Sequence, residues 1–215
     1  MIKDLVYKEF RLNIVPWAYT FFAFALLLLI PSWVFFIAIA YIYMVIMFVA
    51  QFDKANNDLA FAMSLPVPKR SIVQARTMTV IIVELGFLAL CTPIAILRYY
   101  LYPHGNEVGM NVNLAFFGLM LVMFVIFNTI YLPGAYKRAY RMLWPLLGGT
   151  AISVTIIGIL TTLIAVIPSL SILNDRGLGN LGAQATVFVA SVVVYAVVTY
   201  VAYRKAASNF AKVDL

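Results

Sequence analysis

The chain has 215 residues, of which 65% are hydrophobic and only 11% charged, and its net charge is +7. A soluble domain of ordinary composition is about 45–50% apolar and about 25% charged, so these values exclude the soluble globular class and indicate a membrane protein. Because each helical crossing needs about 20 apolar residues, the length accommodates roughly six spans and excludes a fused ATPase, kinase or receptor domain.

The first 13 residues predict an amphipathic helix at the membrane interface. The apolar residues Ile2, Leu5, Val6, Phe10 and Ile14 recur at helical spacing, and charged residues fill the positions between them. A helix of this kind lies in the plane of the interface with its apolar face towards the acyl chains. We therefore expect an interfacial helix over residues 1–13, directly before the first span.

Six apolar segments follow, and charged residues, prolines and glycines set their boundaries. The stretch between Arg11 and Asp53 carries no charge, is too long for one helix and is interrupted at Pro31-Ser32. Proline also marks the ends of the fourth and fifth segments, at Pro133 and Pro168, because it disrupts helical hydrogen bonding. The sequence therefore predicts an all-α integral membrane protein with a single transmembrane domain over residues 1–215. The expected spans are 14–30, 33–51, 77–97, 113–132, 145–167 and 184–203.

The distribution of basic residues predicts the orientation. Of the 15 Lys and Arg residues, 13 lie in the N-terminal segment, the second loop, the fourth loop and the C-terminal tail, and only Arg98 and Arg176 lie on the other side. Loops rich in Lys and Arg remain in the cytoplasm. Both termini are therefore expected in the cytoplasm. This orientation accounts for most of the net charge, so no nucleic-acid partner is expected.

The sequence carries none of the usual signatures of an enzyme or a metal site. It has no G-x-x-x-x-G-K-[ST] loop, no H-E-x-x-H motif and no pair of His, Cys, Asp or Glu at metal-ligand spacing. Residues 177–182 match G-x-G-x-x-G, but they follow a membrane span instead of a β-strand, so we interpret them as an outer loop. The chain itself is expected to be no enzyme and to bind no metal or nucleotide.

Glu84 is the one acid within an expected span. Charged groups at the centre of a helix in the bilayer cost about 2.5–3.5 kcal/mol. Glu84 therefore either lines a transport pathway or a subunit interface, or reaches the cytoplasmic interface or pairs with a basic side chain there. Asn128, Thr161 and Thr162 are weaker polar positions, with a pathway role or helix–helix hydrogen bonds as the two interpretations.

The loop between the second and third spans is the most informative segment. Asp58 can cap a short helix that carries apolar residues such as Leu59 and Phe61, and Pro66 ends this helix. A cytoplasmic helix with such side chains either docks on a protein partner or lies on the membrane interface.

The loop contains an acidic, Asn-rich stretch, then Ser-Leu-Pro-Val at 64–67, the basic pair Lys69-Arg70, and Ile72-Val73 before the third span. This pattern resembles the permease subunits of bacterial ABC-2-type exporters, above all the small members with about six spans. The layout of the whole chain is similar as well. The resemblance implies a bacterial cell (cytoplasmic) membrane protein that pairs with a second permease copy or a paralogue. It also implies separate cytoplasmic ABC ATPase subunits, which bind ATP and Mg²⁺.

The same resemblance implies how the ATPase is contacted. In the family, the loop between spans two and three forms a coupling helix that docks in a groove of the ATPase, and the next inner loop makes a second contact. In the first loop the docking candidates are Asp58, Leu59, Phe61, Met63, Leu65, Pro66, Lys69 and Arg70. In the second loop they are Tyr136, Lys137, Arg138 and Arg141. Residues 168–183 occupy the place of short outer helices that help form an extracellular gate.

These expectations describe a permease that exports an amphipathic or hydrophobic cargo, such as a peptide, driven by the partner ATPase. Small permeases of this kind are associated with export of, or immunity to, antimicrobial peptides. One alternative is an ATP-independent secondary transporter or channel, which would normally require more intramembrane ionisable groups than Glu84 and an internal repeat. The other is a membrane anchor that recruits a cytoplasmic partner without transport.

Overall fold

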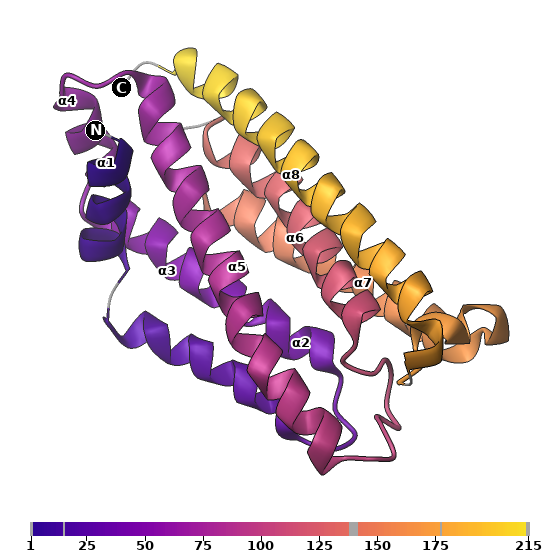
Figure 1. Cartoon of the computed structure of the whole chain (residues 1–215). Helices are drawn as coiled ribbons and strands as arrows, with labels where there is room; N and C mark the ends of the chain where they lie inside the picture. The colour runs from indigo at the N-terminus through magenta and orange to yellow at the C-terminus, as the bar shows by residue number, and fades with distance from the viewer. Residues whose placement is uncertain (1, 15, 138–141, 177, 214–215) are drawn as a thin grey trace.

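A computed structural model of the chain describes residues 2–14, 16–137, 142–176 and 178–213 (Figure 1). All regular elements in these ranges are helical, which confirms the all-α class. Five helices are long and apolar enough to cross a membrane, and the bent N-terminal pair Ile2–Asn13 and Pro16–Leu29 brings the number of candidate spans to six. The fold therefore agrees with a multi-pass membrane protein.

The N-terminal segment changes direction where the interfacial helix was expected to meet the first span. Helix α1 (Ile2–Lys8) continues into the π-helical turn η1 (Glu9–Asn13), and a bend of 88° separates this pair from the 3₁₀ helix η2 (Pro16–Leu29). A 3₁₀ helix rises about 2.0 Å per residue, so the length of η2 is about 28 Å, close to the roughly 30 Å of a hydrocarbon core. The tight winding lets a segment of 14 residues approach the full membrane thickness.

The second span consists of two collinear pieces. Helices α2 (Phe35–Ala40) and α3 (Ile42–Ala55) are interrupted at Tyr41 and together form one candidate span. The tight turn before them contains Ser32, whose φ of 54° is unusual for a residue other than glycine. The Ser32 hydroxyl donates a hydrogen bond to Glu107 at 3.3 Å, which ties this turn to the loop after α5 (Lys69–Leu101).

Helix α4 (Asp58–Ser64) differs from expectation at its first residue. Asn57, not Asp58, occupies the N-cap position, with a left-handed φ of 49° that asparagine tolerates well. The Asp58 side chain instead pairs with Lys8. The ammonium group of Lys8 carries a full positive charge, whereas a capping interaction would pair the carboxylate only with a backbone N–H. The helix ends at Leu65, which is extended because the following residue is Pro66.

Four long helices complete the bundle: α5 (Lys69–Leu101), α6 (Leu114–Ala135), α7 (Leu143–Val166) and α8 (Leu181–Ala211). Helices α5 and α8 extend about two turns beyond the expected spans at the end of the bundle that carries the chain termini (Figure 1). Helix α6 continues through Pro133, where the fourth span was expected to end. The Pro133 carbonyl there accepts a hydrogen bond from Asn209 of α8 at 2.9 Å.

Helix α6 forms the centre of the bundle and buries side chains against both α7 and α8. Close approach to α8 depends on Gly118, because a Cβ at this position would lie 3.1 Å from the backbone of Phe188. On the opposite side, Phe127 stacks on Tyr43 of α3 with ring centroids 4.1 Å apart. Aromatic and glycine residues thus fix the helix spacing around α6.

Candidate functional site

Five ionisable side chains form a buried group near the chain termini, which we call the ionic cluster. They come from α1, η1, α3, α4 and α5, and they are Lys8, Glu9, Asp53, Asp58 and Arg76. Lys8 Nζ lies 2.7 Å from Asp58 Oδ1, and Arg76 Nε lies 2.8 Å from Glu9 Oε2. Arg76 Nη2 also lies 3.5 Å from Asp53 Oδ1. The cluster therefore links the N-terminal segment of α1 and η1 to α3, α4 and α5.

A neutral side chain completes the cluster. Asn13 Nδ2 donates to Glu9 Oε2 at 3.1 Å and to Asp58 Oδ2 at 3.0 Å. Since Glu9, Asp53, Asp58 and Arg76 are all buried, loss of a basic member leaves buried carboxylates without compensation, which typically costs about 3–5 kcal/mol. The cluster thus holds α4 firmly against the N-terminal segment and α5.

Asp58 is the member of the cluster that belongs to the predicted docking loop. Burial alone would raise the pKa of its carboxyl group, but hydrogen bonds from Lys8 and Asn13 and the charges of Lys8 and Arg76 outweigh that effect. The pKa of Asp58 consequently lies below its ordinary value of 3.8. At neutral pH this carboxylate is charged and pairs with Lys8.

The other docking candidates in the first loop divide into an inward and an outward set. Leu59 is buried, and Met63 packs against the core. The two basic residues contact the C-terminal part of the chain, since Lys69 donates to the Val213 carbonyl and Arg70 donates to the Tyr203 hydroxyl. The outward set is Phe61, which is 54% exposed, together with Leu65 and Pro66.

In the second loop, the structure describes two of the four docking candidates. Tyr136 is buried, with its ring 5.1 Å from that of Phe210 of α8. Lys137 is exposed. Arg138 and Arg141 lie outside the described residues.

Within the bundle, Glu84, Asn128 and Tyr195 form a group that we call the polar triad. Asn128 Nδ2 donates to Glu84 Oε2 at 2.9 Å, and the Tyr195 hydroxyl donates to the same oxygen at 2.8 Å. Glu84 and Asn128 are fully buried. Two of the predicted polar positions therefore meet, and the sequence analysis missed the third member, although Tyr195 stands alone in a run of Val and Ala residues.

Thr161 and Thr162 do not join the polar triad. Their hydroxyls donate to backbone carbonyls of α7 itself, Thr161 to Ile157 at 2.9 Å and Thr162 to Gly158 at 2.8 Å. Such bonds are made within one helix turn and position no group towards a neighbouring helix.

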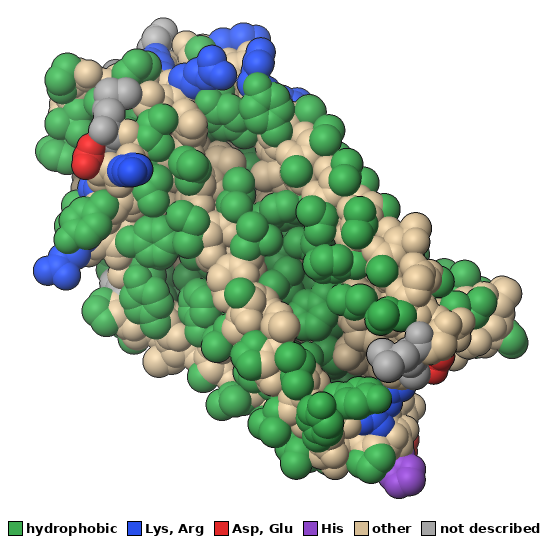
Figure 2. Space-filling model, viewed as in Figure 1, with side chains coloured by type: hydrophobic (Ala, Val, Ile, Leu, Met, Phe, Trp, Pro, Cys, Tyr) green, Lys and Arg blue, Asp and Glu red, His purple; other side chains and the backbone are tan. Residues whose placement is uncertain are grey.

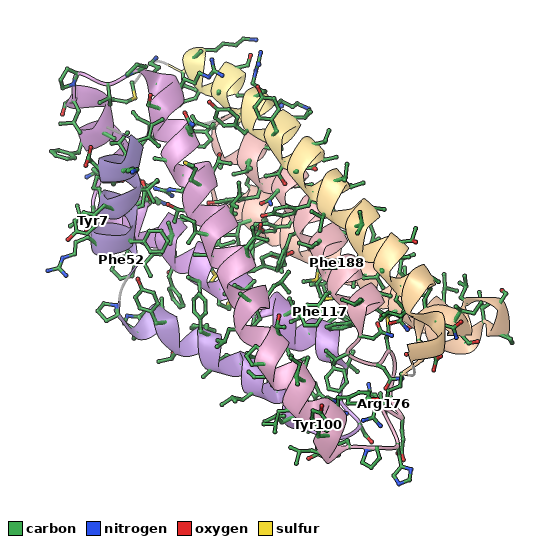
Figure 3. All side chains as sticks on the ribbon, in the orientation of Figure 1. Tyr7, Phe52, Tyr100, Phe117, Arg176 and Phe188 are labelled. Carbon is green, nitrogen blue, oxygen red and sulfur yellow. The ribbon has the colours of Figure 1, made fainter. Side chains whose placement is uncertain are left out.

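A groove of about 1010 Å³ runs between α5, α6 and α8. Hydrophobic side chains cover this face of the molecule (Figure 2). Figure 3 shows Phe117 and Phe188 between α5 and the α6–α8 pair, with Tyr100 and Arg176 at the far end of α5. Tyr195 also lines the groove, so the polar triad borders it.

The segment expected to form an outer gate contains two short 3₁₀ helices, η3 (Pro168–Leu173) and η4 (Leu178–Asn180). It is tied to the loop between α5 and α6. Asn111 N donates to Asn174 Oδ1 at 2.7 Å, and Asn113 Nδ2 donates to the Leu173 carbonyl at 2.8 Å. These bonds join the two loops at the end of the groove opposite the chain termini.

Comparison with known protein families gives one match that spans nearly the whole chain. A family model described as "ABC-2 family transporter protein" matches residues 2–211. Searches of curated proteins and of solved structures gave no match.

Proposed function

Because the chain belongs to the ABC-2 transporter family, whose members are membrane permeases of the ABC exporter type, we propose that it couples ATP hydrolysis on a separate ATPase to the export of an amphipathic or hydrophobic cargo. In this proposal the partner subunits bind ATP and Mg²⁺. The chain itself supplies the pathway and performs no chemistry.

The observation that carries the proposal is the connection between α4 and the groove. The ionic cluster joins Asp58 of α4 to Arg76 of α5 through Lys8, Glu9 and Asn13. From Arg76 onwards α5 remains helical to Leu101, with Pro93 inside it, and lines the groove from Ile81 onwards. A displacement of α4 would therefore reach the groove wall as a rigid-body movement of one helix.

The outward set is the proposed contact with the ATPase. Exposed Phe61 on α4, with half-buried Leu65 and exposed Pro66 directly after the helix, offers a small apolar surface beside a rigid attachment. ATP-dependent movement of the partner would change the free energy of this contact, and only such a difference between two states can shift the permease between conformations. Lys137 marks the second proposed contact.

We further propose that two permease subunits, identical or paralogous, assemble in the bacterial cytoplasmic membrane. Helices α7 and α8 present exposed apolar side chains such as Ile159, Val193 and Val197, which require lipid or a second subunit as neighbours. The basic residues, 13 of 15 of which lie in the terminal and inner-loop segments, favour a cytoplasmic location for both termini.

The test is purification of the tagged chain from its native membrane in mild detergent, followed by mass spectrometry of the proteins that accompany it. We expect a stoichiometric soluble subunit with P-loop and ABC signature motifs. Isolation of the chain alone under several mild extraction conditions would contradict the proposal. Transport by the chain without an ATPase would favour a secondary transporter, and an ATPase activity insensitive to cargo would favour an anchor.

A further inference from the structure

The groove is chemically asymmetric. Its long wall is apolar, with lining side chains that include Leu85, Leu88, Ala89, Phe117, Phe188 and Val192. Two guanidinium groups, of Arg98 and Arg176, line the end farthest from the chain termini, together with Tyr99, Tyr100 and Tyr102. An apolar body with a cationic end is complementary to an amphipath whose head group is anionic.

Arg98 is held in place but keeps one donor unused. Its Nη1 donates to the carbonyls of Leu28 and Ile30 at 2.8 and 3.1 Å, and its guanidinium stacks on Phe35 and Tyr102, 4.3 and 4.9 Å from the ring centroids. The side chain is 95% buried, and Nη2 has no hydrogen-bond partner among the described residues. An unsatisfied buried donor on a charged group is unfavourable, so an incoming anionic acceptor would be stabilised.

Arg176 adds a second positive charge at the same end. It donates to the Tyr99 carbonyl and stacks on the Tyr99 ring at 4.5 Å. Of the neighbouring acids, Asp175 accepts a hydrogen bond from Asn180 and Glu107 accepts one from Ser32. In the described parts of the chain, neither guanidinium forms an ion pair with a carboxylate.

We infer that the groove binds a single-chain amphipath with an anionic head group, which places a carboxylate against Arg98 and Arg176 and its tail along α5 and α8. The inference rests on the proposed function, because it makes this amphipath the exported cargo. From Ile81 to Arg98, α5 extends about 25 Å along the groove.

The experiment measures binding of radiolabelled oleate to the purified chain in detergent, without an ATPase, and compares it with oleyl alcohol as the neutral analogue. We expect saturable binding of oleate that is about tenfold tighter than binding of oleyl alcohol, since one charge-assisted hydrogen bond is worth about this factor. The Arg176→Gln variant should lose this advantage and leave oleyl alcohol binding unchanged.

Two further variants separate loss of the site from loss of the fold. Arg204→Gln is the matched control, because Arg204 also contacts a tyrosine, Tyr200, but lies near the opposite end of α8. It should bind oleate as the unmodified chain does. Ala89→Trp should weaken both probes, since it fills the apolar part of the groove.

Several outcomes would overturn the inference. The first is equal binding of oleate and oleyl alcohol, and the second is undiminished oleate binding by Arg176→Gln. The third is displacement of oleate by phosphatidylglycerol at lower concentrations than by unlabelled oleate. This third result would assign the groove to a bilayer lipid. Loss of oleate binding on dimerisation would assign it to a second copy of the chain. Because no ATPase is present, these results are independent of whether the chain co-purifies with one.

Discussion

Glu84 shows how a single buried carboxyl group organises its surroundings. Its Oε2 accepts hydrogen bonds from Asn128 and Tyr195, which come from two different helices. The side chain therefore holds α5, α6 and α8 together at one point beside the groove. Substitutions of Glu84 that keep or remove these hydrogen bonds can therefore distinguish a structural role of this residue from a role in transport.

We predict that Glu84→Ala destabilises the protein by about 2 kcal/mol, because two buried donors lose their acceptor. Glu84→Gln retains an acceptor oxygen and should cost less than half as much. Thermal unfolding of the purified variants in detergent measures both effects. Equal stability of Glu84→Ala and the unmodified chain would contradict the bonding role. If Glu84 also serves the pathway, Glu84→Gln should alter cargo-stimulated ATP hydrolysis by the assembled complex.

The Asp58 carboxylate gives a prediction for pH. Folding lowers its pKa below 3.8, so the folded state favours the charged form, and this contribution to stability is complete well above pH 3.8. It is lost only as the pH falls through the lower pKa of the folded state. The stability difference between the unmodified chain and Asp58→Asn should therefore be constant from pH 7 to pH 5 and shrink below about pH 4. A difference that disappears between pH 7 and pH 5 would show that Asp58 is not paired as described.

At the scale of elements, α4 combines firm attachment with an exposed apolar surface. Asp58 and Leu59 fix one side of the helix to the rest of the chain, whereas Phe61 is exposed and Leu65, directly after the helix, is half-buried. An element of this kind can transmit a force only if it is bound on both sides.

We predict that the double substitution Phe61→Asp with Leu65→Asp abolishes co-purification of the ATPase, with membrane insertion and thermal stability retained. Two charges on an apolar contact surface would each remain unpaired in the complex. Val108→Asp is the control, because Val108 is also exposed and apolar but lies in the loop after α5. Unchanged ATPase recovery with the double variant would place the docking surface elsewhere.

The lengths of apolar segments were sufficient to predict the helices, but they do not specify how the helices are wound or interrupted. Helix η2 crosses as a 3₁₀ helix and the second span breaks at Tyr41, and neither has a local sequence signal that the spacing of apolar residues detects. The unexpected cap of α4 has a different cause. Asp58 has a partner in Lys8, 50 residues away, and that partner exists only after the fold has formed.

The candidate site was predictable only where a residue is unusual on its own. Glu84 is conspicuous because charge within a span is expensive. Its partner Tyr195 lies 111 residues away and carries a neutral hydroxyl. A tyrosine is not costly within a span, so the sequence alone does not mark it as unusual. Arg76 and Glu9 pair over 67 residues, and each looked like an ordinary charge at a membrane boundary.

At the scale of the whole molecule, the chain termini lie at one end of the bundle, and η3 with the loop after α5 lies at the other (Figure 1). This arrangement predicts opposite accessibility of Ser64 and Ser171, which are both exposed. In intact cells, the Ser171→Cys variant should react with a membrane-impermeant maleimide. The Ser64→Cys variant should react with it only after the cells are lysed. The single native Cys91 is buried and should stay unlabelled, and reversed labelling would invert the proposed orientation.

The position of the ionic cluster in the chain has a consequence for biosynthesis. All five of its members, and Asn13 as well, lie within the first 76 residues, so the cluster can close before the second half of the protein has left the ribosome. The N-terminal half then enters the membrane as a pre-assembled unit, against which α6 to α8 dock afterwards. The last interface to form during synthesis is the boundary between α5 and the α6–α8 group, where the groove lies. A boundary that is completed last and contains an apolar groove is also the natural place for the mature protein to open again.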